Sequence, residues 1–142
     1  MPHDESAYVF AKENRAIGHA GLSSTAPDLL NFLEMLLREG ELHGRRFFSN
    51  QILQDMRTNQ ISELGSFTGL GWELNQPRFM GKYCTEHTFG KKGFTGASVV
   101  CDIERGVAFV LLSNRTYPKR PANDTAINAF RSDIADVMLE SM

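Results

Sequence analysis

The sequence has little cysteine, no long apolar run and no block of like charge. Its 142 residues include two cysteines, Cys84 and Cys101, which lie outside any Cys-x-x-Cys pattern, so we expect two free thiols. The longest apolar run, Val107–Leu112, is far shorter than the roughly 20 residues of a membrane-spanning helix. The formal net charge is −2, and like charges form only short pairs such as Arg45-Arg46. Neither nucleic acid nor an anionic membrane is therefore expected as a partner.

Targeting and metal-binding patterns are also lacking. The first residues, Met-Pro-His-Asp-Glu-Ser, are acidic and polar where a signal peptide has a basic start and an apolar stretch, so we expect no export signal in this chain. The four histidines have neither His-x-x-x-His spacing nor a nearby pair of thiols. We therefore expect no metal and no other cofactor. Length and composition, with 42% hydrophobic and 23% charged residues, predict a single domain over residues 1–142.

Two helices are expected in the first half of the chain. Thr25 is a suitable N-cap, Asp28 stands three residues later as in a capping box, and Gly40 is a natural stop, so the first helix is predicted over Thr25–Glu39. The apolar residues that follow helical spacing within it are Leu29, Leu30, Phe32, Leu33, Leu36 and Leu37. A second, shorter helix is predicted within Ser49–Asn59.

The second half of the chain reads as an antiparallel sheet. Leu70, Trp72 and Leu74 alternate as in a strand. Ala97–Asp102 and Val107–Ser113 are rich in β-branched and apolar residues and are separated by a turn that ends in glycine, which predicts a hairpin. Because the second of these strands is apolar without interruption, we expect it to be central and covered on both faces.

A long C-terminal helix should follow the sheet. Asn123-Asp124 can cap its start, and its expected core stripe is formed by Ile127, Phe130, Ile134, Val137 and Met138. The order of elements predicts the α+β class, with a mainly helical part over 1–64, about three antiparallel strands over 65–121 and the helix over 122–142.

Four segments of the chain are similar to the sequence motifs of one known family. The segment at 18–29, GHAGLSSTAPDL, is similar to the GHAGLFSTA-x-DL stretch of that family, and the segment at 3–7, HDESA, resembles the HDENA that precedes it. FGKKGFTG at 89–96 resembles the GHTGFTG strand, which replaces the Lys-Thr-Gly of β-lactamases in many members. VLLSNRTYP at 110–118 resembles the end of the following strand. Together these segments resemble the β-lactamase-related serine hydrolases, a family that includes penicillin-binding proteins, D-aminopeptidases and esterases. The resemblance implies the C-terminal portion of a β-lactamase/transpeptidase-like fold.

The nucleophile of that family is missing from this chain. No serine has a lysine three residues later, no tyrosine or serine has an asparagine two residues later, and no Gly-x-Ser-x-Gly is present. In the family, the serine attacks an acyl carbon and two backbone N–H groups hold the oxyanion. We therefore expect the chain to be inactive by itself and to need the N-terminal half of a bacterial serine hydrolase that acts on an amide or ester.

The resemblance implies a site along the FGKKGFTG strand. It gives Lys91 the role of the first residue of the triplet and makes the backbone N–H of Phe94 an oxyanion donor; these are the candidate catalytic residues. Lys92, Gly93, Thr95 and His3 are the candidates for substrate contact, and glycine at 93 would let an acyl substrate approach the backbone closely. A lysine at 92, where a hydroxyl residue is usual, puts recognition of β-lactams in doubt.

An ordinary structural or solvent-exposed role remains the alternative for each of these residues. Lys91 can be an ordinary solvated strand lysine, Gly93 an ordinary strand glycine, and His3 a solvent-facing terminal residue. His19 is expected to fix its loop rather than to catalyse. A hydrolase with another nucleophile, such as Cys84 or Ser98, is a third reading.

A stand-alone module that binds a ligand or a partner is the alternative to a hydrolase fragment. If the N-terminal strands are absent, the sheet has an unpaired edge and helices lose their cover. The expected partners are then a small-molecule or peptide acyl substrate in the complete protein and a second copy of the chain, in a homodimer with possible strand exchange.

Overall fold

The computed structural model describes residues 5–15 and 18–141, and it has the α+β fold that the sequence predicts. No helix within these ranges is both long and apolar enough to cross a membrane. In chain order the elements are α1 (Glu5–Lys12), α2 (Ala26–Leu37), β1 (Glu41–Leu42), β2 (Arg45–Arg46), α3 (Asn50–Arg57), the 3-10 helix η1 (Ser62–Leu64), β3 (Glu73–Leu74), α4 (Pro77–Met80), β4 (Thr88–Lys92), β5 (Gly96–Asp102), β6 (Val107–Asn114) and α5 (Thr125–Glu140).

The sheet that carries the predicted site is antiparallel and has the strand order β3-β4-β5-β6. The hairpin of β5 and β6 is confirmed, with Val99 opposite Val110 in its register. The expected central position of β6 is wrong, because β6 is the last strand in this order. Both faces are covered over residues 107–110, whose side chains alternate between the two apolar clusters, while Leu112 further along is exposed. An apolar run of this kind does not show whether a further strand pairs alongside.

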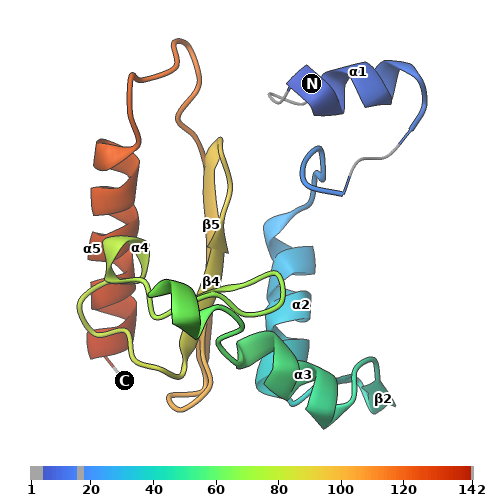
Figure 1. The fold of residues 1–142 in the computed structure, drawn as a ribbon, viewed down its shortest axis with the longest axis vertical. Coiled ribbons are helices and arrows are strands. Elements are labelled where there is room, and N and C mark those ends of the chain that lie inside the picture. Colours follow the sequence, from blue (N-terminus) through green and yellow to red (C-terminus); the bar gives the residue numbers. More distant parts are fainter. Residues whose placement is uncertain (1–4, 16–17, 142) are drawn as a thin grey trace.

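Helices cover the sheet on both sides (Figure 1). Successive side chains of a strand point to opposite faces of the sheet, so the strands contribute to two separate apolar clusters. One cluster lies on the side of α2 and α3 and contains Phe89 and Cys101, and the other lies on the side of α4 and α5 and contains Val100 and Phe109. Trp72 belongs to the first cluster and stacks edge-on against Phe89 at 5.1 Å between ring centroids.

The expected helix after Thr25 is confirmed as α2. The Thr25 hydroxyl accepts a hydrogen bond from the Asp28 N–H at 3.4 Å and donates one to the Asp28 carboxylate at 3.0 Å. In a capping box the carboxylate would instead accept from the backbone N–H of Thr25. The predicted strand near Leu70 is shorter than its pattern, because regular pairing covers only β3 and the Leu70 side chain is exposed.

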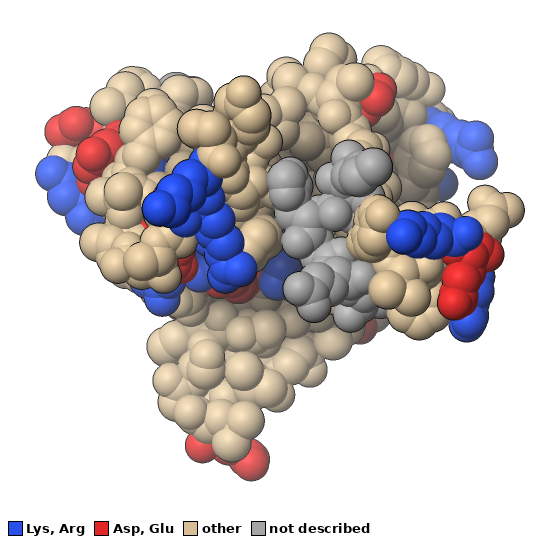
Figure 2. Space-filling model, turned by 90° about the horizontal axis from the view of Figure 1, so that it is seen from above, with Lys and Arg blue, Asp and Glu red and all other residues tan. Residues whose placement is uncertain are grey.

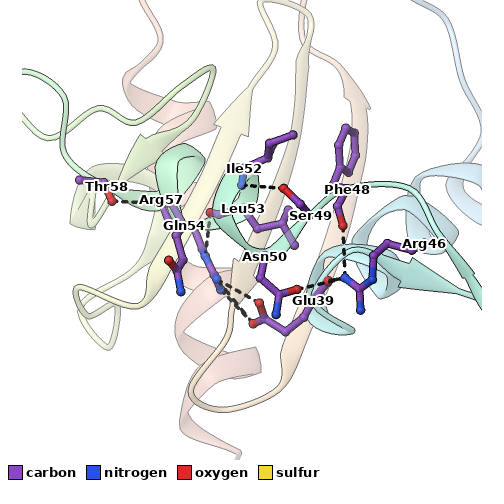
Figure 3. A network of polar contacts seen from close by, with 10 residues as sticks. All are labelled: Glu39, Arg46, Phe48, Ser49, Asn50, Ile52, Leu53, Gln54, Arg57 and Thr58. Carbon is purple, nitrogen blue, oxygen red and sulfur yellow. Dashed lines mark hydrogen bonds and ion pairs between the residues drawn. The ribbon is translucent and has the colours of Figure 1, made fainter.

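The expected second helix is α3, and polar contacts fix it to the preceding hairpin (Figure 3). The guanidinium of Arg46 donates to the Glu39 carbonyl at 2.7 Å and to Asn50 Oδ1 at 3.0 Å. Arg57 donates to the Leu53 carbonyl and pairs with the Glu39 carboxylate at 3.3 Å. The Arg45-Arg46 pair of the sequence therefore includes a residue with a local structural role.

The C-terminal helix forms where it is predicted, but a different face of it is buried. The residues of α5 that turn inward are Asn128, Arg131, Ala135 and Leu139. From the expected core stripe, Phe130, Val137 and Met138 are exposed, with Val137 at 66%. The stripe assignment is therefore wrong for these three, and α5 presents an apolar face away from the described sheet.

Candidate functional site

The predicted site lies at the end of β4 and in the turn that leads to β5. Lys91 and Lys92 are the last two residues of β4, and Gly93, Phe94 and Thr95 form the turn before β5 begins at Gly96. His3 lies outside the described residues.

Both lysines approach one acidic residue of the neighbouring strand. Lys91 Nζ lies 3.8 Å and Lys92 Nζ 3.6 Å from the Glu73 carboxylate, whose side chain is 22% exposed. Lys92 also lies 5.3 Å from the centre of the Phe79 ring. The charge of these lysines is thus partly balanced within the fold, while Lys91 remains mostly open to solvent.

The backbone of the turn has all of its carbonyl groups occupied. The carbonyls of Phe94 and Thr95 accept from Arg115, through its Nε at 2.9 Å and its backbone N–H at 2.7 Å. Those of Gly93, Gly96 and Ala97 accept from the buried guanidinium of Arg131 on α5. The turn is therefore held by Arg115, which directly follows β6, and by Arg131 of α5.

The N–H groups of Phe94 and Thr95 differ from these carbonyls in their hydrogen bonding. Within residues 5–15 and 18–141, neither donates a hydrogen bond to a protein acceptor, whereas the Gly93 N–H donates to Ala97 at 2.7 Å and the Gly96 N–H to Gly93 at 3.1 Å. Phe94 is 46% exposed. An N–H that is not bonded to a protein acceptor, in a turn with fixed carbonyls, is a suitable donor to an oxyanion.

Sequence reasoning missed both arginines. Arg115 stands in the SNRTYP segment quoted for its resemblance, but no role was predicted for it. Arg131 was passed over because a charged residue does not belong to an apolar stripe, and the stripe was placed on another face. The sequence signal available for Arg131 was that it is the single basic residue of α5, and for Arg115 that it directly follows β6.

Cationic groups surround the Phe94 ring. The guanidinium carbons of Arg115 and Arg120 lie 5.3 and 4.6 Å from its centre, within the range of cation–π contacts. Figure 2, which looks down on this end of the molecule, shows a group of Lys and Arg side chains on this face. The neighbourhood of the free N–H groups is thus electropositive.

Gly93 has no structural need to be glycine. A Cβ built at this position meets the Ala97 carbonyl oxygen at 3.5 Å, an ordinary van der Waals contact, and the residue does not have a positive φ. Gly96 differs, because its φ is +113° and a Cβ would lie 2.4 Å from Ser113 Oγ. Space for an approaching substrate therefore remains a reason for glycine at 93, while the fold explains glycine at 96.

The alternative nucleophiles are poorly placed for catalysis. Ser98 is buried within the sheet. Both cysteines are free thiols, as expected. Burial raises the pKa of the Cys84 thiol, and burial raises that of Cys101 to about 12, so neither is a thiolate near neutral pH.

Several cavities among the described residues lie away from this turn. One of about 350 Å³ is lined by Glu34, Arg38, Glu41, His43 and Gly44. Its Glu34 and Arg38 form an ion pair at 2.8 Å on the surface of α2, which is a common helix contact and no sign of catalysis. In the described part of the chain, no group of three or more His, Cys, Asp or Glu side chains is arranged to hold a metal.

The antiparallel sheet with helices on both faces and a glycine-rich turn at the end of an inner strand agrees with the β-lactamase-like domain that the sequence resemblance implies. The family model described as Beta-lactamase matches residues 1–132. The chain therefore belongs to the beta-lactamase family, and the resemblance found in the sequence is confirmed.

Individual relatives agree with this assignment. An Escherichia coli O157:H7 protein named as a D-alanyl-D-alanine carboxypeptidase is 34% identical over 131 residues, 89% of this chain and 29% of the relative. An N-acetylmuramyl-L-alanine amidase of Bacillus subtilis is 29% identical over 92% of this chain and 30% of the relative. A crystal structure of a beta-lactamase from Mycobacterium bovis has a TM-score of 0.67 and 27% identity, covering 86% of this chain and 46% of that one. The chain thus spans less than a third of these curated relatives.

Proposed function

We propose that the chain is the C-terminal portion of a serine hydrolase that cleaves an amide or ester through an acyl-enzyme, and that it supplies the oxyanion strand. The observation that carries the proposal is the free N–H of Phe94 in a turn whose carbonyls are all occupied. An oxyanion needs donors that are held in place and not already bonded. Lys91 is the candidate for orienting the substrate or assisting proton transfer, and Lys92, Gly93 and Thr95 border the path of the substrate.

The names of the relatives support an amide as the substrate class. A D-alanyl-D-alanine carboxypeptidase and an N-acetylmuramyl-L-alanine amidase both cleave an amide bond that involves an alanine residue. We infer the same bond type here, with the nucleophilic serine and its lysine contributed from outside the 142 residues, which contain no Ser-x-x-Lys.

The proposal predicts that the isolated chain does not turn over acyl substrates. Nitrocefin, p-nitrophenyl acetate and a D-alanyl-D-alanine peptide are offered to the purified chain and to the product of the complete gene. We expect turnover only from a product that carries Ser-x-x-Lys, and loss of that turnover when its serine is replaced by alanine. Turnover by the 142-residue chain that persists through repeated purification would refute the missing-nucleophile argument.

A second candidate function is a non-catalytic dimerisation module, which two observations favour. β6 is the terminal strand of the described sheet and carries the exposed Leu112, and α5 exposes Phe130 and Val137. An unpaired strand edge beside exposed apolar side chains promotes association.

We expect the isolated chain to sediment as a homodimer at micromolar concentration. Leu112→Glu or Val137→Glu should shift it to monomer, because each places a charge in the contact. The matched control is Leu22→Glu, at a position that is 92% exposed and distant in sequence from both elements. A wild-type chain that stays monomeric at about 100 µM, where even a weak Kd of that order allows association, excludes this candidate.

A further inference from the structure

Arg131 is a buried cation whose hydrogen bonds, among the described residues, go to neutral oxygens. It is 3% exposed, and its Nε donates to Gly96 O at 3.2 Å while its Nη2 donates to both Gly93 O and Ala97 O at 2.9 Å. Its Nη1 donates to Asn128 Oδ1 at 2.9 Å, one turn earlier on α5. Burying a guanidinium is unfavourable unless its N–H donors are hydrogen-bonded. Because α5 buries Arg131, several of these donors are bonded to one segment of the chain.

That segment is the turn that carries the free N–H groups. Two of the three carbonyls held by Arg131, those of Gly93 and Ala97, also accept the turn's own bonds from the Gly96 and Gly93 N–H groups. A peptide group is planar, so fixing the Gly93 carbonyl fixes the direction of the N–H that follows it, which belongs to Phe94. The contact therefore acts on the orientation of this N–H, and not merely on the attachment of α5 to the sheet.

We propose that Arg131 is a positioning residue that sets the direction of the Phe94 N–H and keeps the turn electropositive. The catalytic meaning of this inference rests on the proposed function, whereas the conformational part stands on the described contacts. Because the four hydrogen bonds of Arg131 go to uncharged oxygens, its charge is not neutralised by a bonded carboxylate and contributes to the field at the turn. Preorganised donors of this kind stabilise developing negative charge without reorganising.

The first test uses the 142-residue chain and measures the turn directly. Arg131→Met keeps much of the side-chain volume but removes the fork, and Arg131→Lys keeps the charge without the planar fork. The matched control is Arg78→Met, because Arg78 is an exposed arginine that pairs with Asp124 next to α5. Backbone amide exchange and ¹⁵N relaxation are recorded for residues 93–97 by NMR.

We expect the Gly93 and Gly96 amides to exchange at least 10-fold faster in Arg131→Met than in Arg78→Met, and the Phe94 N–H vector to become disordered. Residues of β6 should keep their protection. If Arg131→Met does not fold, Arg131→Lys carries the test, since loss of the fork alone is expected to loosen the turn. Protection of residues 93–97 within twofold of the control in a folded variant would overturn the inference.

The second test separates this inference from the proposed function. In a complete gene product that carries Ser-x-x-Lys, Arg131→Met should lower kcat about 10²-fold, the scale of losing one oxyanion donor, with little change in KM. Arg131→Lys should recover part of the loss, and Arg78→Met should show none. A loosened turn with unchanged kcat would leave the positioning role standing and refute the oxyanion role of Phe94. An unchanged turn would refute the positioning role whatever the kinetics.

Discussion

Asp102→Asn is expected to lower the free energy of unfolding by about 3 kcal/mol at pH 7, the scale of breaking one partner of a buried charged pair. Asp102 is fully buried at the end of β5. Its carboxylate accepts from the Thr88 hydroxyl at 2.6 Å and from Arg105, through the backbone N–H at 2.9 Å and Nη1 at 2.8 Å. The amide of asparagine keeps the shape but leaves the guanidinium without its counter-charge.

The same network predicts how stability depends on pH. Burial raises the pKa of Asp102, but the hydrogen bonds from Thr88 and Arg105 outweigh it, so that the pKa lies below its ordinary value. A carboxyl whose folded pKa is lowered stabilises the fold above its unfolded pKa of about 3.9, and this contribution is lost as the pH falls through the folded pKa. Stability should therefore drop below about pH 4, and Asp102→Asn should lack this part of the drop.

Urea unfolding from pH 2 to pH 7 measures both effects. The matched control is Asp133→Asn on the exposed side of α5, for which we expect a change within about 0.5 kcal/mol. If Asp102→Asn is as stable as this control at pH 7, the buried network does not hold the hairpin of β5 and β6.

Local patterns account for the parts of the fold that the sequence predicts well. α2 and the β5–β6 hairpin are defined by a cap, a helical stripe and a turn between β-branched runs, all of which lie within a few residues of one another. The short helices α4 and η1 were not predicted, because the glycines around them suggested a strand region. Their formation depends on contacts such as the burial of Phe79 against α5, which local sequence does not contain.

The position of β6 within the sheet and the buried face of α5 could not be derived from local patterns. A continuous apolar run gives the same pattern in a central strand and in β6, which is an edge of the described sheet. On α5, hydrophobicity favours the stripe through Phe130 and Val137, but the inward face holds Arg131 because the carbonyls of the 93–97 turn need donors. That requirement is set by a partner element more than 30 residues away in sequence, since the Arg131 to Ala97 bond spans 34 positions.

The candidate site was reached through resemblance rather than through chemistry visible in the residues. FGKKGFTG contains no Ser-x-x-Lys and no nucleophile paired with a histidine or carboxylate base, so composition and spacing alone give it no role. What makes the segment a candidate is backbone hydrogen bonding, with occupied carbonyls and a free N–H at Phe94. Side-chain patterns cannot report which backbone groups remain unbonded.

Replacement by alanine should affect stability very differently at Gly93 and Gly96, the two glycines at the ends of this turn. Gly96→Ala is expected to destabilise the chain by about 3 kcal/mol, because it combines a backbone conformation that L-residues avoid with crowding of the new Cβ. The φ of Gly96 is +113°, and a Cβ built there would crowd Ser113 Oγ. Gly93→Ala should change stability by less than about 1 kcal/mol, since its Cβ meets only ordinary contacts from Ala97.

Relative to the stability that each variant loses, Gly93→Ala should lose more activity than Gly96→Ala. In a complete gene product, the proposed function predicts that Gly93→Ala lowers kcat/KM about 10²-fold without unfolding the protein, because the new Cβ would obstruct the approach of a substrate to the Phe94 N–H. Thermal unfolding and turnover are measured on both variants, with each rate compared below the Tm of that variant. Full activity of a folded Gly93→Ala protein would mean that no substrate passes close to this backbone, and the oxyanion strand would have to be sought elsewhere in the domain.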